Sequence, residues 1–208
     1  MVIPTKYRQA TDAIINYDFV DIISETGYIS VYGFSDEANN KLLIRQVLES
    51  SDVKSQVVGT SGNVEVNFDY EFNKGAHIKG DMYVTITIFA DGSASNAVDN
   101  DTTIEIFHFD GSTETTIGTQ QAMERLNNPV STAEDQARYT AKFAVDKRFS
   151  RGDKLRVEVI STLANSSNVN NKIGFYHDPK NRDFSLVDQH GAGAPSNLIV
   201  TVPFKIET

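Results

Sequence analysis

Residues 77–90, with the sequence HIKGDMYVTITIFA, contain the pattern that decides the fold. Apolar and polar side chains alternate with a period of two from Met82 to Ile88. This is the period of a β-strand that buries one face and leaves the other in contact with solvent. The stretch therefore predicts a half-buried strand.

The same alternation recurs in short segments that are separated by Gly, Asn, Asp and Ser. About nine or ten strands at this spacing are typical of an all-β sandwich. The other candidate strands lie at 28–34, 41–49, 63–72, 103–109, 138–145, 154–162, 171–177 and 197–206. Long polar loops at 90–102 and 161–172 favour an antiparallel β-sandwich of the jelly-roll kind, because its cross-connections need loops of that size. An immunoglobulin-like sandwich is the second choice, since the chain lacks the Trp and the cysteines that such domains usually carry.

Two segments depart from the strand pattern. Residues 118–128, GTQQAMERLNN, predict one short helix, with Met123 and Leu126 three positions apart and an Asn pair at the end. Residues 1–16 contain few periodic apolar side chains, so we expect an extended N-terminal arm there. Residues 17–208 then form a single sandwich domain, which is a common size for such folds.

A basic residue, a glycine and an aspartate precede two of the strands, at residues 79–81 (Lys-Gly-Asp) and 151–153 (Arg-Gly-Asp). The second tripeptide is also a known cell-adhesion ligand. Glycine accepts the positive φ of a tight reversal, and aspartate bonds backbone amides in turns. We therefore interpret both as turns, and Arg151-Gly152-Asp153 as a corner between two strands.

Composition excludes several classes of function. The 208 residues carry 19 Lys and Arg against 28 Asp and Glu, a formal net charge of −9 without any basic cluster. Nucleic acids and anionic membranes are therefore not expected partners. The chain has no cysteine, which excludes disulfides and thiolate zinc sites. The first residues lack the apolar core of roughly 7–15 residues that a signal peptide needs, so we expect no export by such a signal.

The four histidines show no metal-ligand spacing. His77, His108, His177 and His190 have no second histidine or carboxylate in an H-x-H or H-x-x-x-H arrangement. His177 and Asp178 are neighbours within GFYHDP, and two interpretations stay open: an acid–base or metal-binding pair, or a strand end with an Asp-Pro turn. We favour the turn, because adjacent side chains on a strand point apart.

Acidic residues offer one weak candidate for a metal site. Asp99, Asp101 and Glu105 have a spacing like the start of a calcium loop, but the glycine at the sixth position is missing. No carboxylate pair for glycoside hydrolysis can be selected from the sequence alone. The sequence therefore predicts no catalytic, cofactor-binding or metal-binding residue.

Parts of the chain resemble virion structural proteins of tailed viruses of bacteria and archaea. The residues that carry this resemblance are IPTKY (3–7), NYDFVDIISETGYISVYGF (16–34), GFYHDP (174–179) and LIVTVPFKIE (198–207). The resemblance implies a sandwich or jelly-roll component of the particle, and it brings no active site with it.

From this resemblance and the absence of a catalytic cluster we expect an accessory or minor capsid protein, of the decoration type, that is located in the virion and is not an enzyme. The alternative is a carbohydrate- or receptor-binding module, for which Tyr83, Phe89 and Tyr176 are candidate contact residues. A hydrolase on the same scaffold is the third choice.

The resemblance also implies partners. We expect contacts with the major capsid protein or other virion proteins and a homo-oligomer, with a trimer favoured. The less charged segment NLIVTVPF (197–204) and the arm at 1–16 are the expected contact regions, since open sheet edges are protected when neighbours cover them.

Overall fold

The computed structural model describes residues 26–36, 40–46, 54–92, 97–128, 134–178 and 197–205. These residues form twelve strands, whose bounds follow in chain order. They are β1 (Thr26–Ser35), β2 (Lys41–Ile44), β3 (Lys54–Val58), β4 (Asn63–Glu71), β5 (Ala76–Asp91), β6 (Val98–Phe109), β7 (Glu114–Ala122), β8 (Leu126–Asn128), β9 (Glu134–Phe149), β10 (Lys154–Ala164), β11 (Lys172–Tyr176) and β12 (Ile199–Lys205).

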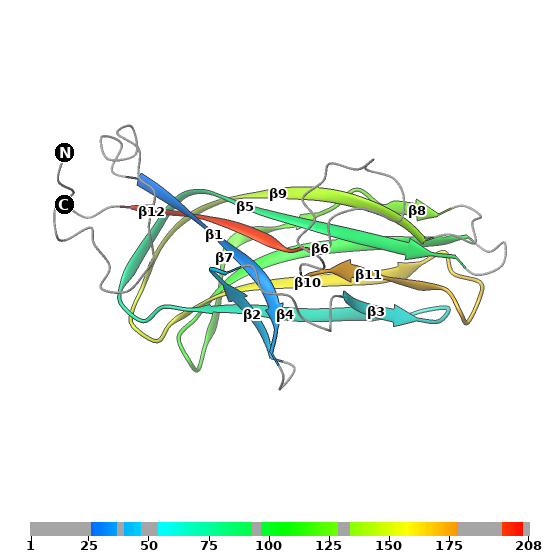
Figure 1. The fold of residues 1–208 in the computed structure, drawn as a ribbon, viewed down its shortest axis with the longest axis horizontal. Helices are drawn as coiled ribbons and strands as arrows, with labels where there is room; N and C mark the ends of the chain where they lie inside the picture. The colour runs from blue at the N-terminus through cyan, green and yellow to red at the C-terminus, as the bar shows by residue number, and fades with distance from the viewer. Residues whose placement is uncertain are drawn as a thin grey trace.

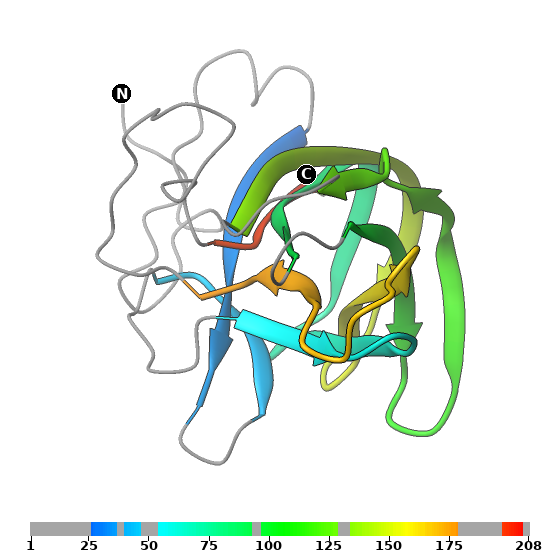
Figure 2. The same cartoon turned by 90° about the vertical axis from the view of Figure 1, so that its right-hand side faces the viewer.

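The strands join into one continuous hydrogen-bonded sheet that curls around a core (Figures 1 and 2). Its order is β3-β11-β5-β12-β1-β2-β4-β10-β6-β7, with β8 paired to β6 and β9 paired to β5. All pairs are antiparallel except β2 with β4, which meet in parallel at Leu42 and Asp69. The predicted all-β sandwich is confirmed, and jelly-roll topology stays a prediction.

The core follows from the alternation in the sequence. In β10 the side chains of Leu155, Val157 and Val159 are buried, and the residues between them are partly exposed. Strand β5 behaves likewise, since the side chains of Met82, Val84 and others in it are fully buried. Burial of such side chains stabilises the fold by about 1.5–3 kcal/mol each.

The predicted helix at 118–128 is wrong, because those residues lie in β7 and β8 and in the segment between them. No helix occurs in the described part of the chain. Thr and Gln dominate β7, and its pairing with β6 supplies backbone hydrogen bonds that outweigh the weak helical spacing of Met123 and Leu126.

The two Gly-Asp copies have different structures. Gly152 has a φ of +90° and lies in the tight turn between β9 and β10, as predicted. Gly80 has a φ of +130° but lies inside β5, so the predicted turn there is wrong. A Cβ on Gly80 would lie 3.3 Å from Cβ of Pro203, where the pairing of β5 with β12 shifts register. Gly80 therefore permits an irregularity in the sheet and not a reversal.

The arm at 1–16 lies outside the described residues. The homo-oligomer, with a trimer favoured, stays a prediction.

Candidate active site

Ser55 and His177 come together because β3 pairs with β11. Phe175 is the register partner of Ser55. Since side chains alternate along a strand, His177, two residues beyond Phe175, continues the face on which Ser55 lies. The backbones approach closely at Gly174, where a Cβ would lie only 2.0 Å from the carbonyl oxygen of Ser55. Glycine at this position is therefore a condition for the contact.

A chain of hydrogen bonds connects a hydroxyl, an imidazole and a carboxylate. Ser55 Oγ lies 3.1 Å from His177 Nε2. His177 Nδ1 bonds Asp178 Oδ1. The other carboxylate oxygen, Asp178 Oδ2, accepts the backbone N–H of Ser35 at 2.8 Å. The carboxylate thus fixes both the position and the tautomer of the ring, with the proton on Nδ1 and the lone pair of Nε2 facing the serine.

The surroundings hold the imidazole in place. The side chains of His177 and Asp178 are fully buried. The rings of Phe68 and Phe175 lie 5.4 and 6.1 Å from the imidazole, centroid to centroid. The backbone N–H of Leu198, which precedes β12, donates to the carbonyl of His177 at 2.9 Å. The dyad is therefore fixed by both side-chain packing and backbone bonds.

Ser55 differs from its two partners in its position. β3 is an edge strand of the described sheet, and Ser55 is partly exposed. A nucleophile must meet its substrate, whereas the base and the orienting carboxylate work best out of water. The arrangement therefore has the nucleophile–base–orienter geometry that characterises covalent acyl transfer.

The interpretation of His177 and Asp178 as a simple strand-end turn is thus incomplete. The two side chains do not point apart, as adjacent residues on a strand would, but bond each other just beyond the end of β11. Ser55 was missed altogether, because it is 122 residues away in the sequence. The one local signal was the His-Asp-Pro turn, since a chain that leaves a strand can turn adjacent side chains toward each other.

The other histidines and the acidic candidates have structural partners. His77 bonds Asp146 and His108 bonds Asp153, each at 2.7 Å, while His190 lies outside the described residues. Asp99 and Asp101 both bond Arg125, and Glu105 accepts bonds from Thr116 and Gln120. Among the described residues no group of three or more His, Asp or Glu has the arrangement of a metal site.

The turn at 151–153 uses its aspartate internally. Asp153 Oδ2 accepts the backbone N–H of Ser150 and the Nε2–H of His108, each at 2.7 Å. The N–H of Gly152 donates to the carbonyl of Phe72 at 2.7 Å. An adhesion ligand would need the carboxylate free, so the geometry supports the interpretation as a corner.

The aromatic residues considered for ligand contacts are engaged in the fold. Phe89 is fully buried. Tyr176 donates its hydroxyl to Glu134, and its ring packs against Phe89 at 5.2 Å. Burial and the bond to Glu134 raise the pKa of Tyr176. Tyr83 lies within β5 and is partly buried.

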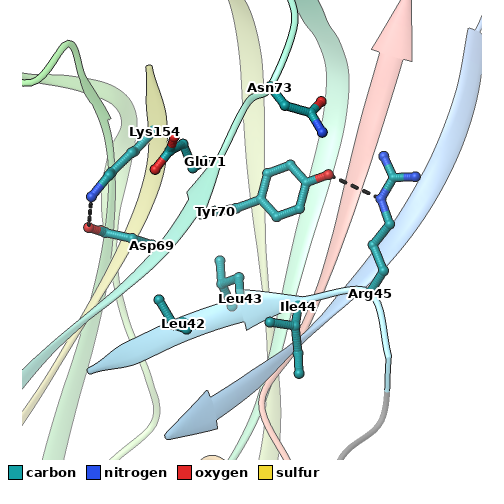
Figure 3. A pocket seen from close by; sticks show the side chains of 9 residues that line it. All are labelled: Leu42, Leu43, Ile44, Arg45, Asp69, Tyr70, Glu71, Asn73 and Lys154. Atoms are coloured by element: carbon teal, nitrogen blue, oxygen red, sulfur yellow. Dashed lines mark hydrogen bonds and ion pairs between the residues drawn. The ribbon is translucent and has the colours of Figure 1, made fainter. Parts of the chain in front are cut away.

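A separate pocket of about 420 Å³ opens between β2 and β4. Figure 3 shows the ring of Tyr70 in the middle of the side chains that line this pocket. The lining residues are Leu42, Leu43, Ile44, Arg45, Asp69, Tyr70, Glu71, Asn73 and Lys154.

The described part of the chain contains no helix with the length and hydropathy of a membrane span.

Comparisons with known proteins give weak likenesses in structure. No family model matches the chain, and no curated protein sequence does. A CocE/NonD family hydrolase from Staphylococcus aureus aligns with a TM-score of 0.49 at 10% identity, over 86% of this chain and 37% of the hydrolase. An aminopeptidase from a marine sediment Thaumarchaeota archaeon aligns with a TM-score of 0.49 at 10% identity, again over 86% and 37%. A mutant VP2 protein of infectious bursal disease virus aligns with a TM-score of 0.27 at 11% identity, over 80% and 39%.

These findings correct two predictions. The two enzymes align with a higher TM-score than the viral protein, so the expected virion structural role is wrong, and so is the expectation that the protein is not an enzyme. The likeness to viral capsid proteins remains only as a weak one in fold. Because the chain spans about 37% of the length of the hydrolase and aminopeptidase chains, none of their activities is assigned to it.

Proposed function

We propose that the protein hydrolyses carboxylic esters by covalent catalysis at Ser55. His177 is the general base, and Asp178 orients and stabilises its imidazole. The observation that carries the proposal is the continuous chain of hydrogen bonds from Ser55 Oγ through both nitrogens of His177 to the buried carboxylate of Asp178.

In the first half of the reaction, Ser55 Oγ attacks the carbonyl carbon of the ester and His177 Nε2 accepts the hydroxyl proton. The bond from the carbonyl carbon to the alcohol oxygen then breaks, and the alcohol leaves with the proton from His177. In the second half, a water molecule attacks the carbonyl carbon of the acyl-serine while His177 removes a proton from that water. The acid is released, and the proton returns to Ser55.

The burial of the dyad supports this role in physical terms. In a site that excludes water, the negative charge of Asp178 stabilises the imidazolium that forms beside it more strongly than it would in bulk solvent. The N–H of Ser35 holds the other carboxylate oxygen at 2.8 Å. The ring therefore keeps Nε2 directed at Ser55 throughout the reaction, without the cost of reorganising solvent.

A labelling experiment with matched variants tests the proposal. The wild-type protein is treated with a fluorophosphonate probe, and its turnover of p-nitrophenyl acetate is measured. We expect covalent labelling at Ser55, detected by peptide mass spectrometry, and loss of labelling and turnover in Ser55→Ala. The control is Ser61→Ala, an exposed serine in the turn between β3 and β4, which should keep both.

Two results would overturn the proposal. One is a wild-type protein that neither reacts with the probe nor turns over the ester. The other is a Ser55→Ala variant with unchanged turnover. Either would mean that the hydrogen-bonded chain only satisfies buried polar groups, which must find partners in any fold.

A further inference from the structure

Strand β3, which carries Ser55, has a partner strand on one side only in the described sheet. It is five residues long, and that partner is β11. An edge strand lacks the second row of backbone bonds that fixes an inner strand, so its side chains and flanking turns decide its position. Ser55 Oγ lies 3.1 Å from His177 Nε2, and a shift of β3 would change this distance. The contacts that hold β3 therefore bear on the site.

The C-terminal end of β3 is held by the segment between β10 and β11. The N–H of Gly59, directly after Val58, donates to the carbonyl of Asn171 at 3.0 Å. The carbonyl of Gly59 accepts the hydroxyl of Ser166 at 2.8 Å. These bonds fix the end of the strand that is farther from Ser55. The N-terminal end, where Ser55 lies, is held by a side chain instead.

That side chain belongs to Lys54, the first residue of β3, and it reaches across the sheet. Its Nζ lies 4.7 Å from the ring centroid of Phe89 in β5 and 5.7 Å from that of Tyr176 in β11. Both are cation–π distances. The same Nζ lies 3.5 Å from Oε2 of Glu134 in β9. One side chain thus connects the edge strand with three other strands.

The carboxylate that Lys54 contacts is itself fixed. Oε1 of Glu134 accepts the hydroxyl of Tyr176 and the side-chain amide of Gln136. The side chains of Lys54 and Glu134 are 34% and 18% exposed, so the pair is partly shielded from solvent. Exposed ion pairs contribute little because both side chains move freely. Here the ammonium group lies over two rings and the carboxylate has two further donors, so the geometry of the pair is restricted.

These contacts and the proposed nucleophile lie on opposite faces of the same two strands. Lys54 is the register partner of Tyr176, and Ser55 is that of Phe175. Neighbouring side chains of a strand point to opposite faces. Ser55 therefore shares the face of the buried Phe175, and Lys54 lies on the other face. Any effect of Lys54 on the reaction must pass through the backbone of β3.

We propose that Lys54 is a positioning residue for the reaction at Ser55. Its contacts with Phe89, Tyr176 and Glu134 hold the N-terminal end of β3 against β11. Ser55 Oγ is thereby kept within hydrogen-bond distance of His177. The inference rests on the proposed hydrolysis and adds to it that a charge on the far face of the sheet sets the rate.

Kinetics of matched variants with p-nitrophenyl acetate test the proposal. Lys54→Ala removes all three contacts. We expect kcat to fall by roughly 10- to 100-fold, because a misplacement of about 1 Å has a cost of this order, while KM stays within about twofold. Lys54→Arg keeps the charge and the reach over the rings and should retain most of the turnover. Lys54→Met keeps the apolar stem without the charge and should fall between the two.

The control is Lys172→Ala. Lys172 is the first residue of β11, and its Nζ pairs with Asp91 of β5 at 3.4 Å, a contact that does not involve the side chains of β3. Removal of this second lysine changes the net charge by the same amount as Lys54→Ala. It should leave kcat unchanged, and thermal unfolding verifies that all variants fold.

Hydrogen exchange of residues 54–58 measures the position of β3 without substrate. We expect faster exchange there in Lys54→Ala and in Glu134→Gln, and wild-type exchange in Lys172→Ala. The double variant of Lys54→Ala and Glu134→Gln should exchange no faster than Lys54→Ala alone, because the two residues act through one contact.

The proposal is overturned if Lys54→Ala keeps the wild-type kcat, if Lys172→Ala loses as much turnover, or if β3 exchanges at the wild-type rate in Lys54→Ala. Faster exchange with unchanged kcat would show that Lys54 stabilises β3 but does not position Ser55. A wild-type protein without turnover would refute the hydrolysis, and exchange alone would then decide whether Lys54 holds β3.

Discussion

Two histidine–aspartate pairs in this protein have similar bonds and different surroundings. In one, His108 donates to Asp153 at 2.7 Å, and the side chains are 12% and 14% exposed. In the other, the side chains of His177 and Asp178 have no exposure at all. The two pairs differ in what the imidazole contacts besides its carboxylate.

The carboxylate of Asp153 ends its chain by accepting the backbone N–H of Ser150, which completes a turn. The ring of His108 packs edge-on against Phe149 at 4.8 Å. By contrast, the ring of His177 uses its second nitrogen on the hydroxyl of Ser55. Both carboxylates also accept a backbone N–H, from Ser150 and from Ser35, so the difference lies on the far side of the imidazole. A buried pair whose imidazole bonds a hydroxyl can perform acid–base chemistry on it. The same two residue types therefore have different roles that the wider geometry decides.

The largest expected effect is on catalysis. Asp178→Asn keeps the shape of the side chain but removes the charge and favours the wrong imidazole tautomer. We expect ester turnover to fall by a factor on the order of 10³–10⁴. The matched change in the other pair, Asp153→Asn, should leave turnover within about twofold, since no hydrogen bond among the described residues joins that pair to Ser55. Equal losses in the two variants would remove the distinction between the pairs.

The next effect is on the contact between β3 and β11. Gly174→Ala places a Cβ 2.0 Å from the carbonyl oxygen of Ser55, which the backbone can relieve only by moving β3. We expect a loss of roughly 1–3 kcal/mol in the free energy of unfolding, in line with other overpacked sites, together with loss of turnover. Urea denaturation and hydrogen exchange measure both changes, with faster exchange confined to β3 and β11. Gly111→Ala is the control, because a Cβ there meets nothing within 4 Å, although its φ of +96° adds local strain.

Much of the fold could be predicted from the sequence, because its signals are local. The alternation over residues 82–88 and 154–162 gave β5 and β10 correctly. β7 was misread as part of a helix, because Met123 and Leu126 have helical spacing and the Thr and Gln side chains of an edge strand show no apolar period. The catalytic candidate could not be predicted in the same way. The contact of Ser55 with His177 spans 122 residues, and it depends on strand pairing and on the space beside Gly174.

A smaller effect is expected at the turn of the second pair. Asp153→Ala removes the bonds to His108 and Ser150, which should lower the free energy of unfolding by about 1–2 kcal/mol at pH 7.

The hydrogen bond from His108, and then that from the Ser150 amide, lower the pKa of Asp153. A carboxylate with a lowered pKa in the folded state stabilises the protein above its ordinary pKa, and this contribution is lost as pH falls through the folded value. The difference between wild type and variant should therefore shrink between pH 5 and about pH 3, as urea denaturation at each pH would show. A difference that stays constant over this range would contradict the role assigned to the charge.

The smallest effect concerns a carboxylate that neither pair contains. Glu158 in β10 is the register partner of Glu105 in β6 and lies near Glu65 in β4. Burial raises the pKa of Glu158, and the neighbouring carboxylates of Glu65 and Glu105 raise it further. A carboxyl group with a raised pKa destabilises the folded state when it is charged, so the protein gains stability as pH falls from 7 toward that pKa. Glu158→Gln should therefore stabilise the protein at pH 7, by less than about 1 kcal/mol because the side chain is partly exposed and solvent screens its charge. The gain should be smaller at pH 5 than at pH 7, because wild-type Glu158 takes up a proton as pH falls toward its raised pKa. Thermal unfolding at the two pH values measures this, with the exposed Glu124→Gln as the control. A variant that is less stable than wild type at pH 7 would show that Glu158 contributes a favourable bond and not a repulsive charge.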